Sequence, residues 1–300
     1  MSYEAAHQFN GDESNQLRMR LDISRERAMA LGEETVGILS AGSYVSATGM
    51  QVDISRLVAE AVCGTVAYPP ETALPINVFR RSPMLVEVLN ITTLQGVIYL
   101  KNKGHDPAVL NFASAKYPGG GFLDGARAQE EYLARSSALW ACLHGNAMYG
   151  YHHVHHTGPF YSNFVIYSPN VTVIRSDDGA LLDTPYLCSI ITSPAVNANK
   201  VRQYMPDKIE RIVPVMWERM LKVLAVAVLH GHRSLVLGAW GCGAFGNDSN
   251  DIARLFRKAL EETFRGAFDH VLFAITDWSA EQKNIVPFLQ NFGDGQVLIS

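Results

Sequence analysis

The sequence predicts an α/β fold with a helical segment at its N-terminus, and two similar stretches carry this prediction. In the first, the apolar run over 108–113 has the character of a buried strand, breaks at Gly119–Gly121, and is followed by a helical pattern from about Ala128. In the second, the apolar run Leu235–Leu237 enters another glycine loop and then the helical stretch DIARLFRKALEETF. A strand, a glycine loop and a helix that follow one another in this way indicate an α/β domain.

The composition restricts the class of protein. With 300 residues, of which 48% are hydrophobic, the chain can form a substantial core as one large domain or two. Only 18% of the residues are charged and the net charge is −4, which excludes a basic protein that binds nucleic acid. A bound diphosphate would therefore have to be held by local amide groups and helix ends rather than by a broad positive field.

Cysteine usage and hydropathy indicate where the protein acts. Cys63, Cys142, Cys188 and Cys242 are widely spaced and form no CxxC pair, which predicts free thiols in a reducing compartment. The N-terminus has no signal-peptide pattern, and no long uncharged apolar span follows. We expect an intracellular, cytoplasmic protein (or a nuclear one in a eukaryote) that has no membrane partner.

The first part of the sequence predicts mostly helix. Residues 1–15 are polar and aperiodic, so we expect a frayed end. Residues 17–42 have the pattern of one or two amphipathic helices, which Gly42 ends. Residues 44–66 fit a short hairpin or loop followed by a helix that starts at 53–55, and Pro69–Pro70 mark a loop.

Strand and helix patterns alternate in the rest of the chain. Residues 85–89 alternate like a strand, and Thr92 or Thr93 can cap a helix that runs towards Lys103. We expect strand material over 164–174 that Pro169 splits, a turn at 176–179 and a buried strand over 186–194. A long helix should follow over 206–229, with Pro214 at a kink or at its true start. The last elements expected are a helix capped by Asp248, Ser249 or Asn250, a strand over 270–276 and a helix over 284–292.

One segment, YGYHHVHH over 149–156, places four histidines within five residues, His152, His153, His155 and His156. Histidine is a common zinc ligand, and strand-like alternation could aim His153 and His155 the same way. No third ligand stands at a recognisable spacing, however. We therefore expect no metal here and interpret the segment as a loop or an exposed strand edge close to the substrate.

Gln129, Glu130 and Glu131 stand at the entrance of the helix that follows the first glycine loop. A helix start with exposed loop amides suits an anion such as a diphosphate. Two adjacent carboxylates suit cleavage of a glycosidic bond, which needs a proton donor and a base for water. Neighbours on a helix lie about 100° apart around its axis, so one carboxylate would transfer the proton and the other would hold hydroxyls. The alternative is that both merely complement the helix dipole.

The second glycine loop, GAWGCGAFGN, contains a run similar to GxGxxG, formed by Gly241, Gly243 and Gly246. On its own this run suggests the nucleotide loop of a Rossmann dehydrogenase. The loop lies near the end of the chain, however, and too few residues follow it for a second nucleotide-binding half. The position of the loop therefore argues against a Rossmann dehydrogenase.

The pattern GGG, seven residues, then QEE over 119–131 resembles the signature of the poly(ADP-ribose) glycohydrolases, which are built on the macrodomain fold. The flanking segments NFASAKYPGGG, VIYSPNVTVIRSDDG and SIITSPAVNAN resemble the compact microbial type, and the resemblance extends from about Arg25 to Trp278. It implies a macrodomain-like three-layer fold with a mixed central sheet. It also implies a helical extension over 1–80 that packs on a catalytic domain over 81–300.

The resemblance implies a role for each residue of the signature. Glu131 would be the catalytic acid and base, and Glu130 would hold ribose hydroxyls of the leaving unit. Asn111 would hold the distal ribose, with Phe245 packed against that ribose and Trp278 a candidate for stacking on the adenine. The other substrate-binding positions are Gly119, Gly120, Gly121 and Gln129 in the first loop and Gly241, Cys242, Gly243, Ala244 and Gly246 in the second.

The implied reaction is hydrolysis of the ribose–ribose O-glycosidic bond of poly(ADP-ribose), with release of ADP-ribose and no metal or redox cofactor. The implied partners are poly(ADP-ribose) or ADP-ribosylated proteins, and we expect a monomer that does not bind nucleic acid in a sequence-specific way. Two alternatives stay open. One is a macrodomain that binds ADP-ribose without cutting it, and the other is a hydrolase of a mono-ADP-ribosyl linkage on protein or nucleic acid.

Overall fold

The computed structural model describes residues 18–19, 21–74, 83–155, 158–293 and 296–298. A small hairpin is formed by β1 (Ser43–Val45) and β2 (Gln51–Asp53). The main sheet consists of β3 (Val66–Tyr68), β4 (Met84–Leu89), β5 (Ala108–Phe112), β6 (Val165–Arg175), β7 (Leu181–Ser193), β8 (Ser234–Leu237), β9 (His270–Ala274) and β10 (Gln296–Leu298).

The α-helices are α2 (Arg25–Ala41), α3 (Ser55–Cys63), α4 (Thr93–Asn102), α5 (Gln129–Ser136), α6 (Leu139–Leu143), α7 (Ala147–Val154), α8 (Ala198–Tyr204), α9 (Ile212–Leu229), α10 (Ser249–Lys258) and α11 (Val286–Phe292). Shorter helical turns are η1 (Phe122–Asp124), η2 (Gly158–Phe160), η3 (Pro206–Arg211) and η4 (Ala259–Thr263).

The main sheet is mixed, with the strand order β10-β4-β9-β8-β5-β7-β6-β3. The five central strands β4, β9, β8, β5 and β7 run parallel to one another, whereas β10, β6 and β3 pair antiparallel with their neighbours. The carboxyl ends of the parallel strands therefore meet at one edge of the sheet, where ligands bind in open α/β sheets. Both glycine loops leave the sheet at this edge, because they follow β5 and β8.

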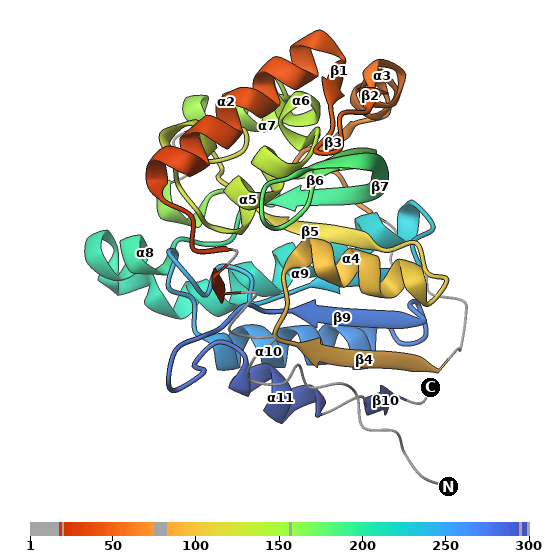
Figure 1. The fold of residues 1–300 in the computed structure, drawn as a ribbon. Helices are drawn as coiled ribbons and strands as arrows, with labels where there is room; N and C mark the ends of the chain where they lie inside the picture. Colours follow the sequence, from red (N-terminus) through yellow and green to blue (C-terminus); the bar gives the residue numbers. More distant parts are fainter. Residues whose placement is uncertain (1–17, 20, 75–82, 156–157, 294–295, 299–300) are drawn as a thin grey trace, which may run out of the picture.

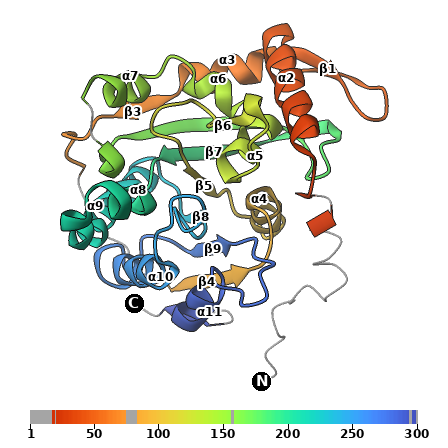
Figure 2. The same cartoon turned by 90° about the vertical axis from the view of Figure 1, so that its left-hand side faces the viewer.

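Alternating strand residues build two separate cores on the two faces of the sheet. Leu110 on β5 packs in the cluster that contains α9, α10 and α11, whereas its neighbour Val109 packs in the cluster that contains α3, α4 and α6. Figure 2 shows α4 and α5 on one side of the sheet and α9 and α10 on the other. This is the expected three-layer arrangement, and the predicted α/β macrodomain-like fold is confirmed.

Several local predictions are confirmed by the caps that fix the helix ends. Thr92 caps α4 in a full capping box with Gln95. Gly42 ends α2 with φ +72°, a conformation that favours glycine. Asp248 caps α10 through the N–H groups of the next residues, and Pro214 stands in the first turn of α9, so it marks the start of that helix rather than a kink.

Other predictions are wrong in instructive ways. The histidine segment is not a loop or strand edge, since residues 147–154 form α7, with Asn146 as its N-cap. The helical pattern from about Ala128 is not one continuous helix: α5 ends at Ser136, Ser137 forms an isolated bridge with Val173, and α6 begins at Leu139. Pro169 does not split the strand over 165–175, which continues through a bulge, and β9 is followed by one more strand, β10. Residues 1–15 and His156 lie outside the described residues.

The N-terminal segment contributes more than a helical cover. Its last strand, β3, extends the main sheet by pairing with β6. Helix α2 packs on η1 and α5, where the Thr35 hydroxyl donates to the Arg135 carbonyl (2.6 Å) and Glu34 pairs with the buried Arg175 (2.8 Å). None of the helices in the described residues is long and apolar enough to cross a bilayer.

Candidate active site

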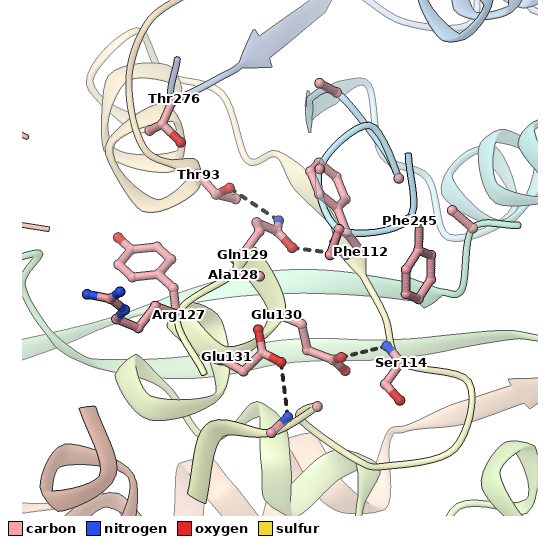
Figure 3. Close-up of a pocket in the computed structure, with 18 of the residues that line it drawn as sticks. Thr93, Phe112, Ser114, Arg127, Ala128, Gln129, Glu130, Glu131, Phe245 and Thr276 are labelled. Carbon is pink, nitrogen blue, oxygen red and sulfur yellow. Dashed lines mark hydrogen bonds between the residues drawn. The ribbon is translucent and has the colours of Figure 1, made fainter. Parts of the chain in front are cut away.

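A cavity of about 1030 Å³ opens at the carboxyl ends of β5, β8 and β9 (Figure 3). Both glycine loops line it, together with the N-terminal ends of α4 and α5 and with Leu21 and Asp22, which precede α2. Of the thirteen predicted site residues, nine line this cavity: Gly120, Gly121, Gln129, Glu130, Glu131, Gly241, Gly243, Ala244 and Phe245. The two glycine loops, about 120 residues apart in the sequence, therefore face one cavity.

Glu130 is the more tightly held of the two carboxylates. Its side chain is only 3% exposed. The Ser114 N–H donates to Glu130 Oε2 (2.5 Å), and Asn111 Nδ2 lies 3.5 Å from Glu130 Oε1. Both oxygens thus face groups of the strand end and of the loop that follows it, so the side chain has one fixed position.

Glu131 is held at one oxygen and open at the other. The Gly121 N–H donates to Glu131 Oε1 (3.0 Å), as Figure 3 shows. Glu131 Oε2 is buried and has no hydrogen-bond partner among the described residues. A buried polar atom without a partner is costly in a folded protein, and such atoms concentrate at functional sites. Glu131 as a residue lines the cavity, so this unpartnered oxygen lies beside the space that a ligand would fill.

Gly120 explains why the loop must contain glycine at this point. It has φ +61°, and a Cβ atom there would overlap with Glu131 Oε1 while lying 2.9 Å from Glu131 Cδ and 3.0 Å from Glu130 Oε2. Both carboxylates therefore crowd the same bare stretch of backbone. Although Glu130 and Glu131 point in different directions from α5, both carboxylates reach the backbone at Gly120.

Burial raises the pKa of Glu130 well above its ordinary value of 4.5. The Ser114 N–H and the Asn111 amide oppose this shift because they favour the ionised form, whereas the negative charge of Glu131 adds to it. Burial is the largest of these effects, so Glu130 retains its proton to higher pH than an exposed glutamate does.

This shift makes a prediction about stability. The folded protein holds the Glu130 proton at pH values where the unfolded chain has released it, so the stabilisation is complete below about pH 4.5 and is lost as the pH rises through the folded pKa. In Glu130→Gln this titration is absent, although the amide can accept only one of the two hydrogen bonds. We expect the wild type to be the more stable protein at pH 5 and the difference to shrink towards pH 8, at a slope of up to about 1.4 kcal/mol per pH unit. Urea unfolding of both proteins at several pH values measures this, and a difference that is independent of pH would contradict it.

Gln129 connects the first loop to the sheet and to α4. The Phe112 N–H donates to Gln129 Oε1 (2.9 Å), and Gln129 Nε2 donates to the Leu110 carbonyl (2.9 Å) and to Thr93 Oγ1 (3.2 Å). Figure 3 shows this side chain between Thr93 and Phe112. Gln129 therefore fixes the start of α5, and with it both glutamates, against the end of β5.

The other four predicted residues, Asn111, Gly119, Cys242 and Gly246, do not line the cavity. Asn111 is 0% exposed and donates to Thr192 Oγ1 (3.2 Å) beside Glu130, so it lies behind that glutamate. Gly119 faces Phe122 and Ala134 inside the loop. Burial raises the pKa of the Cys242 thiol to about 12, which makes it a poor nucleophile. A Cβ on Gly246 would clash with Asn199, so this glycine allows α8 to approach the second loop.

Sequence reasoning missed several residues at the cavity. Tyr161 has φ +55°, which is uncommon for a residue with a side chain, and its ring lies 6.1 Å from that of Phe245. Basic side chains also line the cavity: Arg18, Lys116, Arg127, Arg135 and Lys200. Arg127 and Arg135 flank the QEE motif and Lys116 precedes the GGG loop, so their positions in the sequence could have pointed to them. Trp278, a candidate in the sequence, does line the cavity.

The buried histidine of α7 has a structural role. His152 is 1% exposed, and burial lowers its pKa to about 4, so its ring is neutral. The Ser162 N–H donates to His152 Nε2 (3.2 Å), which leaves Nδ1 as the donor to the Met148 carbonyl (2.9 Å). Both ring nitrogens are therefore engaged with protein atoms. Among the residues that the structure describes, no three His, Cys, Asp or Glu side chains gather in a way that could hold a metal ion.

Comparison with known proteins identifies relatives with the same arrangement. The family model described as the catalytic domain of microbial-type PARG matches residues 32–176. The poly(ADP-ribose) glycohydrolase from Thermomonospora curvata is 43% identical, with a TM-score of 0.84, over 89% of this chain and 100% of its own. Its structure with the inhibitor ADP-HPD has the same identity and coverage and a TM-score of 0.82.

A poly(ADP-ribose) glycohydrolase from Deinococcus radiodurans in complex with ADP-ribose is 39% identical over 78% of this chain and 96% of its own, with a TM-score of 0.73. No curated protein gives a significant match. Identity at this level extends over most of the chain, and the QEE helix and the two glycine loops meet at one cavity. The chain therefore belongs to the microbial-type poly(ADP-ribose) glycohydrolases.

Proposed function

We propose that this protein hydrolyses the ribose–ribose O-glycosidic bond of poly(ADP-ribose) and that Glu131 is its general acid and base. The observation that carries the assignment is the unequal treatment of the two glutamates. Glu130 is held through both oxygens, whereas Glu131, which lines the cavity, has one buried oxygen that no protein group engages. A group that exchanges a proton with a ligand needs such an open oxygen.

The proposed reaction has two proton movements. Protonated Glu131 gives its proton to the leaving ribose oxygen while the bond from that oxygen to the anomeric carbon breaks. The anomeric carbon passes through an oxocarbenium-like state, and the Glu131 carboxylate then removes a proton from the attacking water. Water thus adds its hydroxyl to the anomeric carbon and its proton restores Glu131, so the enzyme is unchanged.

The retained ADP-ribose unit would lie between the two glycine loops. Gly241 has φ +76°, and its neighbours Gly243 and Ala244 line the cavity, so backbone amides can approach a diphosphate closely. Phe245 would pack against the distal ribose, with Tyr161 behind it. The similar glycohydrolases whose structures contain ADP-ribose or ADP-HPD support the binding of such a ligand. Asn111 would act on the ribose through Glu130, because it does not line the cavity itself.

Further assignments belong to the same proposal. ADP-ribosylated proteins and free polymer would both be substrates, ADP-ribose would be the product, and the protein would act as a cytoplasmic monomer. All four cysteines are free thiols, which fits a reducing compartment. Residues 1–80 would form an extension on a catalytic domain over 81–300, although β3 joins the main sheet of that domain.

The test of the function is a comparison of linkages. Purified polymer and a mono-ADP-ribosylated protein are each incubated with the protein, and released ADP-ribose is quantified. We expect rapid release from the polymer. Binding of ADP-ribose with no release from either substrate would instead support a macrodomain that only binds, and release from the mono-ADP-ribosylated protein alone would support the other linkage.

A further inference from the structure

An exposed aromatic side chain stands at the tip of the loop over 114–121, and the proposed chemistry does not use it. Tyr117 lines the same cavity as Glu131, yet its side chain is 62% exposed. Lys116 beside it is also exposed and also lines the cavity. A large exposed aromatic residue at the rim of a ligand cavity indicates a contact with something that binds there.

The two ends of this loop hold the two glutamates. At one end the Ser114 N–H donates to Glu130 Oε2 (2.5 Å), and at the other the Gly121 N–H donates to Glu131 Oε1 (3.0 Å). Tyr117 lies midway between these two points in the chain. The Tyr117 ring thus stands on the loop that holds both glutamates and faces the cavity that Glu131 lines.

Hydrogen bonds within the loop fix its tip. Ser114 Oγ accepts from the N–H groups of Lys116 (3.2 Å) and Tyr117 (3.1 Å). The Tyr117 carbonyl accepts from the Gly120 N–H (2.9 Å). The backbone that carries the Tyr117 ring is thus preorganised, which lowers the entropic cost of using the ring as a binding surface.

Helix α7 contacts the tip of this loop through His153. His153 Nε2 lies 3.2 Å from the Lys116 carbonyl, and since a carbonyl can only accept, His153 Nε2 carries the proton and donates it. The His153 ring also stands edge-on to the Tyr117 ring, with centroids 6.1 Å apart at 76°. One member of the histidine segment thereby acquires a role next to the cavity.

The next step rests on the proposed function. In poly(ADP-ribose) the leaving oxygen belongs to the ribose of an adenosine, and the adenine is attached to the adjacent carbon of the same ribose. The base of the leaving unit is therefore the first planar group beyond the bond that breaks. We propose that Tyr117 stacks on the adenine of the leaving unit and that Lys116 faces its diphosphate, so that this loop tip is a binding site for an adenosine leaving group.

Two substrates separate this site from the rest of the enzyme. One is a short poly(ADP-ribose) oligomer, and the other is the methyl glycoside of ADP-ribose, in which methanol replaces the leaving adenosine. We expect Tyr117→Ala to lower kcat/KM for the oligomer about 10-fold, the size typical for the loss of one base–aromatic stack. The kcat/KM of the same variant for the methyl glycoside should stay within about 2-fold of wild type, and Tyr117→Phe should keep both values.

Helix α7 offers a matched pair of variants. His153 and His155 are both exposed, but the His155 ring packs on Tyr151 (centroids 4.2 Å apart) and not on the loop. We expect His153→Ala to reduce the ratio of kcat/KM for the oligomer to kcat/KM for the methyl glycoside by several-fold. His155→Ala should leave this ratio unchanged.

The outcomes distinguish this inference from the function on which it rests. If Tyr117→Ala lowers kcat/KM equally for both substrates, or for neither, the proposed leaving-unit site is wrong while the glycohydrolase proposal stands. The leaving-unit site is also wrong if the wild type has equal kcat/KM values for the oligomer and the methyl glycoside. If the wild type cuts neither substrate, the proposed function itself fails.

Discussion

Replacing Glu131 by glutamine should lower the rate of ADP-ribose release from polymer about 10²–10⁴-fold, the range typical for loss of a general acid–base group. The substitution keeps the shape of the side chain, and its amide oxygen can still accept the hydrogen bond from the Gly121 N–H. It removes the proton exchange at the open Oε2 position. We therefore expect a loss in kcat with little change in the affinity for ADP-ribose, measured by single-turnover release and by calorimetric titration.

The control for this variant is Glu33→Gln, on the exposed face of α2. It makes the same change of charge and atoms away from the cavity, so its rate should equal that of wild type. A Glu131→Gln protein that retains its rate within about 3-fold would show that another group transfers the proton. In that event Glu130, whose pKa is raised by burial, would be the residue to replace next.

The motif predicted the position of the site because its parts are local in sequence. A strand end, a glycine loop and a helix start within 24 residues lie close together, so the pattern predicts that Gly120 and Glu131 meet. The role of Asn111 came from the family resemblance, and the structure places Asn111 behind Glu130. The second glycine loop could be placed beside the first only through the order of the parallel strands. That order puts β8 directly next to β5 and is not visible in either segment.

The histidine segment was misread because local preference and tertiary context disagree there. Histidine and tyrosine are weak helix formers, which favoured a loop or strand edge. Residues outside the segment decide the outcome, since Asn146 caps the helix and Ser162 completes the hydrogen bonds of the buried His152 ring. The positive φ of Tyr161 was also beyond prediction, because nothing in the residue type indicates it.

Glu130 and Glu131 differ in how their carboxylates are buried and partnered, and the sequence does not show this difference. Helix geometry predicts different work for the two glutamates, and the structure buries Glu130 with both oxygens engaged but leaves Glu131 Oε2 without a partner. The sequence could not state which pKa would be raised. Burial decides this for Glu130, and the hydrogen bond from Ser114 only reduces the effect.

Replacing Gly120 by alanine should lower polymer hydrolysis about 100-fold, because a displacement of about 1 Å at a catalytic group costs this much. The new Cβ would overlap with Glu131 Oε1 and lie 2.9 Å from its Cδ, so the carboxylate has to leave the Gly121 N–H. Gly120 also has φ +61°, where alanine carries a backbone strain of about 1 kcal/mol. Strain alone would reduce stability and not the rate of folded protein.

Gly231→Ala separates these two effects. Gly231 has φ +76°, and a Cβ atom there would meet nothing within 4 Å. Both variants should therefore lose about the same stability in urea unfolding, about 1 kcal/mol, whereas only Gly120→Ala should lose activity under conditions where both are folded. If the two variants lose equal activity, strain rather than contact with Glu131 accounts for the loss. If Gly120→Ala retains full activity, the position of Glu131 seen here is not the one that the reaction requires.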